Sequence, residues 1–467
     1  MRYVAATGAL GAGVDRAALF AALECGPRFI AADAGTTDAS AFALGTGQTA
    51  FSRTAVKRDL ETMLDAGIHA GIPVIVGSAG TAGADLHVDW VLAIVDEICA
   101  ERAASLRGFA IYSEQRSDDL QDDLRMGRVA PLGDAAGLLP EDLARCERIV
   151  AMMGVEPIQR ALEFEPAFVV AGRCSDAALF AALPLMHGYD AGLAWHAGKI
   201  VECGTMACET MGPGVMVVEL AHDHFTVRPI GNGLRCTPQS VAAHSLYETA
   251  DPFHFVEPSG TLDISGSTYE AVNESAVLVR GSRFIPSARY SVKLEGAELT
   301  GYRSMIVGGI RDPFILGSLE SWLGDIREYV GSVARRQLDV ELDGARYGLD
   351  FKVYGRNAVM GRLEPKLAPD HEVGLVCSTL APTQAEATEI AKLCRQPLLH
   401  APIDKWSGSI TAFACLLNPA WVEVGPVYRF SLNHVLVVGD PLAAHRLESV
   451  ESGARAPQIE PLAEAAS

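Results

Sequence analysis

The sequence predicts an α/β protein, with an open and mostly parallel sheet, flanking helices, and a second, mixed α/β lobe. Three observations predict it. Short apolar runs alternate with helical patterns in the first half, glycines and acids follow those runs, and strand-like stretches dominate after residue 255. Alternating strands and helices are typical of a parallel sheet covered on both faces. We expect domains at 1–255 and 256–450, and a loose tail at 451–467.

The elements of the first domain follow from these runs and their spacing. Six short apolar runs predict strands: Tyr3–Ala6, Phe29–Ala32, Pro73–Val76, Phe109–Tyr112, Ile149–Met152 and Phe168–Ala171. The segments between them predict helices at Asp15–Glu24, Thr54–Ala70, His87–Ala103 and Glu156–Glu163. Asp15 occupies one N-cap position, and Ser52 or Thr54 another. A further helix is expected in RCTPQSVAAHSLYE (235–248), with Thr237 as its cap and Pro238 in its first turn.

The second lobe is predicted from stretches that alternate between apolar and polar residues. They indicate strands at Ala276–Arg280, Tyr290–Leu294, Leu299–Val307, Glu372–Ser378 and Val427–Asn433. A helix is expected near Thr383–Cys394, and GGIRDP (308–313) leads into another.

The residues after successive strands repeat one pattern, in which glycine, small hydroxyl residues and acids follow the apolar run. These segments are DAGTTD (33–38), GSAGTAG (77–83), SEQ (113–115), MGVEP (153–157) and GRCSD (172–176). Because the carboxyl ends of parallel strands border one crevice, we expect a single site there. Glu114 and Asp176 are its acid–base candidates. Its binding candidates are Asp33, Thr36, Thr37, Gly77, Ser78, Gly80 and Arg173.

Each of these loops also has a plainer explanation. GSAGTAG could turn successive N–H groups toward an anion, but it matches no common nucleotide fingerprint, and a tight turn explains its glycines equally well.

A second group of candidates lies farther along the chain. In YDAGLAWHAGKIVECGTMA (189–207), His196, Lys199 and Cys203 fall on one helical face. His196, Lys199 and His244 are candidates for proton transfer, although a packed histidine beside a solvated lysine fits the same pattern. Lys293, Arg303 and Arg311 are candidates for holding substrate carboxylates.

Composition excludes several classes of protein. A formal net charge of −20 without any Lys/Arg block argues against a nucleic-acid partner. The N-terminal segment lacks the apolar core of a signal peptide, and no run of 18 apolar residues occurs, so we expect a cytoplasmic protein without a membrane span. The ten cysteines include no CxxC pair, and the spacing of Cys203, Cys208 and Cys236 fits no common metal pattern. We expect buried thiols without an iron–sulfur cluster or a metal site, and cofactors stay open.

Motifs spread over residues 1–450 carry a resemblance to a known family. They include SRTAVKRDLETML, IPVIVGSAGTAGAD, AGRCSDAALFAALP, GLAWHAGKIVECG, YSVKLEGAELTGYRS and YGRNAVMGRLEP. With these motifs the chain resembles the acyclic terpene utilisation protein A (AtuA-like) family. The resemblance implies a place in the catabolism of branched acids and acyl-CoA compounds, often beside a small partner protein. It assigns no catalytic residue.

Two functional hypotheses follow. The first is a hydro-lyase or related lyase that acts on a small branched di- or tricarboxylic acid or its CoA thioester, since removal of water beside a carboxylate needs a base, an acid and cations. The second is a non-catalytic binding or scaffold subunit, completed by a small partner protein. A homo-oligomer is expected in either case. Thermal shifts with such acids, followed by turnover assays, separate the two.

Overall fold

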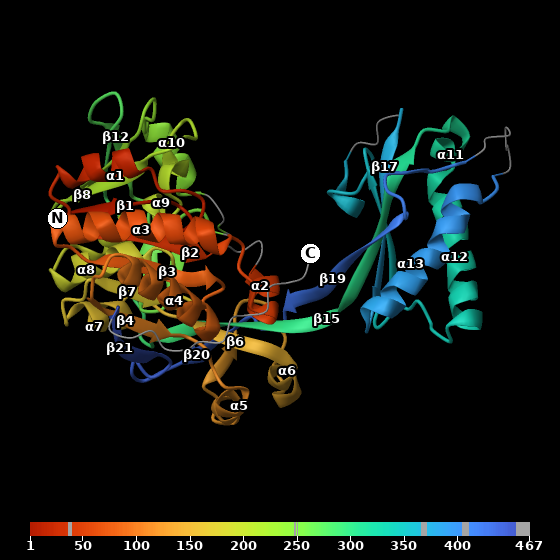
Figure 1. Cartoon of the computed structure of the whole chain (residues 1–467), viewed down its shortest axis with the longest axis horizontal. Coiled ribbons are helices and arrows are strands. Elements are labelled where there is room, and N and C mark those ends of the chain that lie inside the picture. Colours follow the sequence, from red (N-terminus) through yellow and green to blue (C-terminus); the bar gives the residue numbers. More distant parts are fainter. Residues whose placement is uncertain (36–39, 247–248, 250, 366–370, 404–410, 454–467) are drawn as a thin grey trace. The chain divides into compact units, whose positions relative to one another are not determined.

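The computed structural model describes residues 1–35, 40–246, 249, 251–365, 371–403 and 411–453 of the 467-residue chain. The chain forms two compact units. The first contains Met1–Glu298 and the segment from Phe430 onward, and the second contains Leu299–Arg429. Figure 1 labels the elements of both.

The first unit is built on a ten-stranded sheet with the order β12-β13-β9-β8-β1-β2-β3-β7-β4-β21. Its five middle strands are parallel: β1 (Arg2–Ala5), β2 (Ile30–Gly35), β3 (Val74–Thr81), β7 (Phe168–Ala171) and β4 (Leu106–Tyr112). The strands added at either side are antiparallel: β8 (Val215–Leu220), β9 (Phe225–Ile230), β13 (Val277–Arg280), β12 (Thr268–Ala271) and β21 (Arg446–Ser452). The predicted α/β class with a mostly parallel sheet is confirmed.

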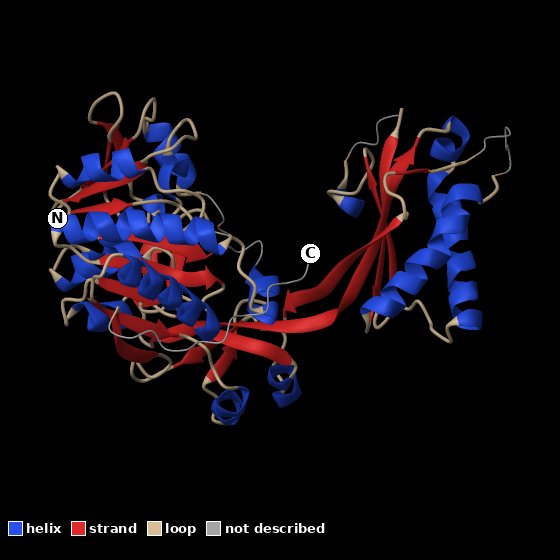
Figure 2. Cartoon of the chain, in the orientation of Figure 1, coloured by secondary structure: helices blue, strands red, loops and turns tan. Residues whose placement is uncertain are grey.

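Helices cover both faces of this sheet, because neighbouring strand residues point to opposite sides. Tyr3 and Phe29 stack on one face at 4.7 Å. That face packs against α7 (Glu156–Leu162), α8 (Ala178–Met186), α9 (Ala191–Val201), the 3₁₀ turn η1 (Gly204–Ala207) and α10 (Pro238–His244). Val4 and Ile30 lie on the other face, which packs against α1 (Arg16–Leu23), α3 (Arg53–Ala70) and α4 (Asp85–Glu101). Figure 2 shows these helices around the strands.

The predicted N-caps are found where the sequence placed them. Asp15 Oδ1 accepts a hydrogen bond from Ala18 N at 3.0 Å, and Ser52 Oγ accepts one from Ala55 N at 3.3 Å. Thr237 Oγ1 accepts from Ser240 N at 3.2 Å and caps α10.

The predicted strand at Ile149–Met152 forms, but it lies outside the parallel sheet. It is part of β6 (Cys146–Met152), which pairs antiparallel with β15 (Ser291–Ile310). The place between β3 and β4 belongs to β7, so β6 finds its partner in a strand that comes much later in the chain.

Shorter elements complete the first unit. The first half of β15 also pairs with β20 (His434–Val437), which pairs with β5 (Val129–Pro131). A three-stranded antiparallel sheet contains β10 (His254–Glu257), β11 (Gly260–Asp263) and β14 (Arg283–Pro286). Three short helices remain: α2 (Ser40–Thr46), α5 (Ser117–Arg125) and α6 (Pro140–Ala144).

The second unit is a mixed α/β lobe, as predicted. The second half of β15 pairs with β17 (Val373–Ala381), β18 (Ala414–Cys415) and β19 (Trp421–Phe430), and β17 pairs with β16 (Gly348–Tyr354). The long helices α12 (Leu319–Gln337) and α13 (Gln384–His400) bury Trp322 and Leu398 against this sheet. Two short helical segments are α11 (Pro313–Gly317) and η2 (Gly361–Leu363).

The expected domain limits can be placed on these units. The limit at 255/256 falls inside β10, because the strands that follow it up to Glu298 pack within the first unit. The expected tail begins within β21, which ends at Ser452, and 454–467 lie outside the described residues. In the described parts of the chain, no helix is both long and apolar enough to cross a membrane.

Candidate functional site

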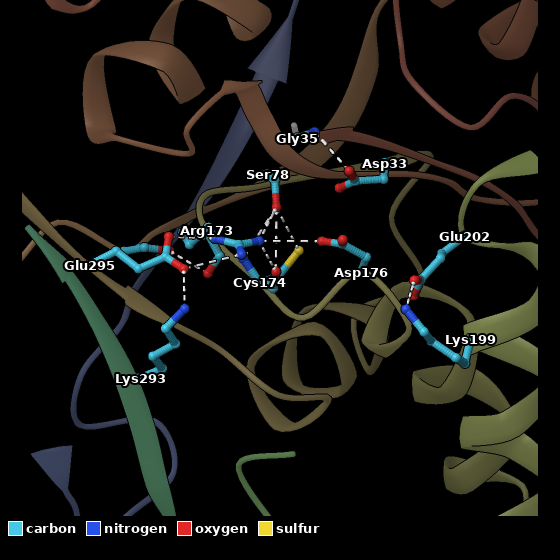
Figure 3. Close-up of polar contacts among 11 residues, drawn as sticks. Asp33, Gly35, Ser78, Arg173, Cys174, Asp176, Lys199, Glu202, Lys293 and Glu295 are labelled. Carbon is cyan, nitrogen blue, oxygen red and sulfur yellow. Dashed lines mark hydrogen bonds and ion pairs between the residues drawn. The ribbon is translucent and has the colours of Figure 1, made fainter. Parts of the chain in front are cut away.

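The loops after β2, β3 and β7 meet at the carboxyl edge of the parallel sheet. Ser78 N donates to Gly172 O at 3.1 Å, which joins the carboxyl-terminal half of β3 to the loop after β7. Asp33, in the second half of β2, lies near them. The charges of Asp176 and Arg173 both shift its pKa, which shows how close the three side chains are. The structure therefore brings together the sequence-predicted residues Asp33, Ser78, Arg173 and Asp176 (Figure 3).

Arg173 is the centre of this cluster. Its Nε donates to Glu295 Oε2 at 2.9 Å, and its Nη1 donates to Asp176 Oδ1 and to Ser78 Oγ, each at 3.2 Å. A further bond runs from Nη1 to the carbonyl oxygen of Cys174 at 2.7 Å. Burial acts against the guanidinium charge, yet Glu295 and Asp176 raise the pKa of Arg173 well above its ordinary value. This cation is fixed in position.

Asp33 is a buried carboxyl group with one oxygen engaged and one unpaired. Its Oδ2 accepts from Gly35 N at 2.8 Å, whereas Oδ1 has no hydrogen-bond partner among the described residues. Burial and the charge of Asp176 raise the pKa of Asp33 well above its ordinary value, against the opposing effect of Arg173. Burial thus favours the neutral form of Asp33 over its carboxylate.

Lys199 and His244 lie at the other side of the cluster, on α9 and α10. Lys199 Nζ pairs with Glu202 (Figure 3), and although burial opposes its charge, that pair raises the pKa of Lys199. Burial and the nearby ammonium group lower the pKa of His244 to about 4. Burial raises the pKa of the Cys203 thiol, with Glu202 adding to the effect. The two helices thus supply one cation and one neutral imidazole.

Two further acids of the cluster, Glu257 on β10 and Glu295 on β15, were not predicted as site residues. Burial raises the pKa of Glu257 to about 8; Ser175 bonds to its carboxyl group, and Oε2 has no partner in the part of the chain that is described. Burial would raise the pKa of Glu295 too, but Arg173 and Lys293 lower it to about 2. Each of them is the single acid in a strand-like stretch, PFHFVEP for Glu257 and YSVKLEG for Glu295. That position is the sequence signal by which they could have been found.

The charges of the cluster balance once the raised pKa values are taken into account. Apart from Asp33 and Glu257, whose pKa values are raised, three carboxylates pair with three cations: Asp176, Glu202 and Glu295 with Arg173, Lys199 and Lys293. Buried charges persist where they are paired, so this balance explains how the cluster is tolerated.

Glu114 and Glu156 lie next to this cluster rather than at its centre. Glu114 Oε2 accepts from Asp85 N at 3.2 Å, and burial raises its pKa. Glu156 accepts from the Tyr290 hydroxyl at 2.7 Å, and burial raises its pKa too. Each thus has a hydrogen-bond partner within the fold.

The GSAGTAG loop serves packing more than the expected anion nest. A Cβ atom on Gly77 would meet Leu179 at 2.5 Å, and one on Gly80 would meet His87 at 2.7 Å. The first N–H group of α4, from Asp85, already bonds to Glu114. The loop is nevertheless unusual, because Ser78 and Thr81 have positive φ angles of 44° and 89°. Strain of this kind concentrates at functional sites.

His196 does not face the cluster as the helical spacing predicted. Its Nδ1 lies 2.7 Å from Ser282 Oγ, and its Nε2 lies 3.3 Å from both Ser245 Oγ and Tyr269 OH. Burial lowers its pKa to about 3. The ring thus packs beside Tyr269 of β12 and Ser282 after β13, whereas Lys199, about one turn later, pairs with Glu202. His196 is a packed, neutral histidine.

The remaining candidates are not part of this cluster. Arg303 and Arg311 belong to the second unit, where Arg311 Nη2 lies 3.1 Å from His371 Nε2. Their separation from Lys293 arises because β15 runs through both units. Thr36 and Thr37 lie outside the described residues.

A hollow of about 1130 Å³ lies at the opposite, amino edge of the sheet, lined by turn residues such as Arg28, Pro73 and Pro166. In open α/β sheets ligands bind at the carboxyl edge, so we place the site at the charged cluster. Within the described ranges, no group of three or more His, Cys, Asp or Glu side chains is arranged to hold a metal ion.

The chain matches one family model, that of the acyclic terpene utilisation family protein AtuA, from residue 30 to residue 404. The match includes the loops after β2, β3 and β7 and both halves of β15. No curated protein and no solved structure matches the chain. The chain therefore belongs to the acyclic terpene utilisation family AtuA, a family implicated in a catabolic role.

Proposed function

We propose that the protein is a hydro-lyase or related lyase that acts on a small branched di- or tricarboxylic acid or its CoA thioester. One observation carries the proposal: Asp33, a buried carboxyl group with a raised pKa, and Asp176, a carboxylate paired with Arg173, belong to one cluster at the carboxyl edge of the sheet. Carboxyl groups kept in different protonation states can take opposite roles in proton transfer.

The cluster contains the three functions that removal of water requires. Asp176, with its side chain 40% exposed, is the base that takes the proton next to the substrate carboxylate. Asp33 is the acid that donates a proton to the departing hydroxyl group. Lys199 and Lys293 are the cations that attract the substrate carboxylates and the charge that develops on them.

Asp33→Asn is the test of this assignment, because asparagine keeps the shape of the protonated acid and cannot donate the proton. We expect kcat/KM to fall by about 100- to 10,000-fold while the denaturation midpoint stays near that of the wild type. The assay follows loss or gain of the carbon–carbon double bond, with citramalate, citrate and their CoA esters as substrates.

Asp59→Asn is the matched control, since Asp59 is also a fully buried aspartate. It lies on α3, and its oxygens accept from the backbone N–H groups of Gly11, Gly13 and Val14. This variant should lose stability and keep its turnover per folded molecule. Full turnover in Asp33→Asn would contradict the proposed acid. Thermal stabilisation of the wild type by these acids without any turnover would instead favour the binding or scaffold subunit.

A further inference from the structure

The thiols of Cys208 and Cys236, in the first unit, lie next to each other on two segments that are joined by hydrogen bonds. Cys208 Sγ and Cys236 Sγ are 3.7 Å apart. Cys208 follows η1 and is half-buried, and Cys236 precedes α10 and is buried. A disulfide bond has a sulfur–sulfur distance of about 2.05 Å, so closing this pair needs an approach of about 1.7 Å.

The backbone on both sides of the pair is joined by hydrogen bonds. Glu209 N donates to Arg235 O at 3.0 Å, and the side chains of the same two residues form an ion pair at 2.6 Å. On the other side, Ser240 Oγ donates to Ala207 O at 2.9 Å. These contacts hold the segments of both cysteines in register, so the proximity of the sulfurs is a property of the fold and not of two free side chains.

We propose that Cys208 and Cys236 form a reversible thiol–disulfide site, oxidised by hydroperoxides. The half-buried Cys208 is the sulfur that meets the oxidant, and the buried Cys236 is the sulfur that resolves it. Thiol-to-thiol hydrogen bonding lowers the pKa of Cys208 and raises that of Cys236, in agreement with these roles.

The chemistry balances in two steps. The Cys208 thiolate attacks one oxygen of the hydroperoxide: an S–O bond forms, the O–O bond breaks, and the leaving oxygen takes up a proton as water or an alcohol. The sulfur of Cys236 then attacks the sulfenic acid: the S–S bond forms, the S–O bond breaks, and hydroxide leaves with the proton of Cys236 as water. Two thiols lose two electrons, and the hydroperoxide gains them.

The disulfide would join two segments that border the charged cluster. Cys208 lies six residues after Glu202 in the segment that continues from α9, and Cys236 precedes the helix that carries His244. Oxidation would therefore tie the segment after Lys199 to α10. The thiol chemistry itself does not depend on the proposed lyase reaction.

Peptide mass mapping of the full-length protein under non-reducing conditions tests the site. After mild hydrogen peroxide treatment, we expect the Cys208 and Cys236 peptides as one linked species that lacks two hydrogens and separates with dithiothreitol. Cys208→Ser and Cys236→Ser should each abolish it. Cys377 and Cys394 form a matched internal control, since they also lie together but are fully buried, and they should stay reduced.

Two results would overturn the proposal. One is independent alkylation of both thiols after peroxide treatment, in the wild-type protein, with no linked species. The other is uptake of one Cu(I) ion by unlinked thiols, because Met216 Sδ lies 3.9 Å from Cys208 Sγ and would complete a set of soft sulfur ligands. Both readouts are masses, so neither depends on whether the chain turns over a substrate.

Discussion

The two edges of the parallel sheet differ in what their loops contain. At the amino edge the loops form a wide hollow with turn residues and the exposed Arg28. At the carboxyl edge they bury a set of opposed charges around Arg173, with an unpaired oxygen on Asp33. The large hollow and the charged, reactive side chains are thus found at opposite ends of the same strands. Buried charge and the position of the carboxyl edge are the grounds on which we place the proposed site there.

The largest expected effect is a difference in unfolding free energy between variants of Arg173, at the carboxyl edge, and Arg28, at the amino edge. Arg173→Gln leaves Asp176 without its cation and leaves the buried Glu295 with Lys293 alone, and loss of one partner of a buried ion pair costs about 3–5 kcal/mol of unfolding free energy. Arg28→Gln at the amino edge should change it by less than about 0.5 kcal/mol. Urea denaturation of both variants measures the difference. An equal loss of unfolding free energy in both variants would show that the ion pairs of Arg173 do not stabilise the fold.

The next effect is a pH dependence that belongs to the carboxyl edge. The folded chain holds the proton of Glu257 up to about pH 8, whereas the unfolded chain releases it near its ordinary pKa. The folded state therefore binds more protons in this window, and stability is lost as the pH rises, by up to ~1.4 kcal/mol per pH unit. Glu257→Gln should remove this part of the slope between about pH 5 and pH 8.

Glu163→Gln, at the rim of the amino-edge hollow, is the control for this measurement. It should leave the pH slope of stability at the wild-type value. A slope that is the same in Glu257→Gln and in the wild type would mean that Glu257 is ionised in the folded protein.

The smallest effect compares strained residues at the two edges. Glu165 has a φ of 49° in the turn before β7, where glycine avoids the strain of a side chain. Glycine also adds conformational freedom to the unfolded chain, so Glu165→Gly should stabilise the fold by only about 0.5 kcal/mol. Ser78 has a φ of 44°, but its Oγ bonds to Arg173, so Ser78→Gly should destabilise the chain by about 1 kcal/mol. Thermal denaturation gives both signs. A more stable Ser78→Gly would show that the hydroxyl adds nothing to the cluster.

Sequence patterns predicted the parts of the fold and cluster that depend on local order. Buried apolar runs located the parallel strands, and the acids and glycines after them brought out Asp33, Ser78, Arg173 and Asp176 together. Small hydroxyl and acidic residues located the caps of α1, α3 and α10, because a cap acts within one turn.

The parts that depend on distant pairing could not be predicted. Glu257 joins the cluster through a contact with Ser175, which lies far away along the chain. Glu295 joins it from β15, whose partner β6 is also distant in sequence, and β6 leaves the parallel sheet because β15 offers it an edge. Helical spacing grouped His196 with Lys199, but spacing alone does not give the direction in which a side chain leans. Lys293 belongs to the first unit and Arg303 and Arg311 to the second, a division that their positions in the sequence do not reveal.

The long strand β15 suggests a way to shorten this chain by removing the second unit. In the first unit Ser431 N donates to Gly296 O at 3.0 Å, and in the second unit Thr300 Oγ1 donates to Val427 O at 2.8 Å. The outgoing and returning strands are thus already paired on both sides of the boundary, so Leu299–Arg429 has the form of a cassette inserted into a hairpin. A two-residue turn such as Asn-Gly between Glu298 and Phe430 would close that hairpin. Every member of the charged cluster would remain in the shortened chain.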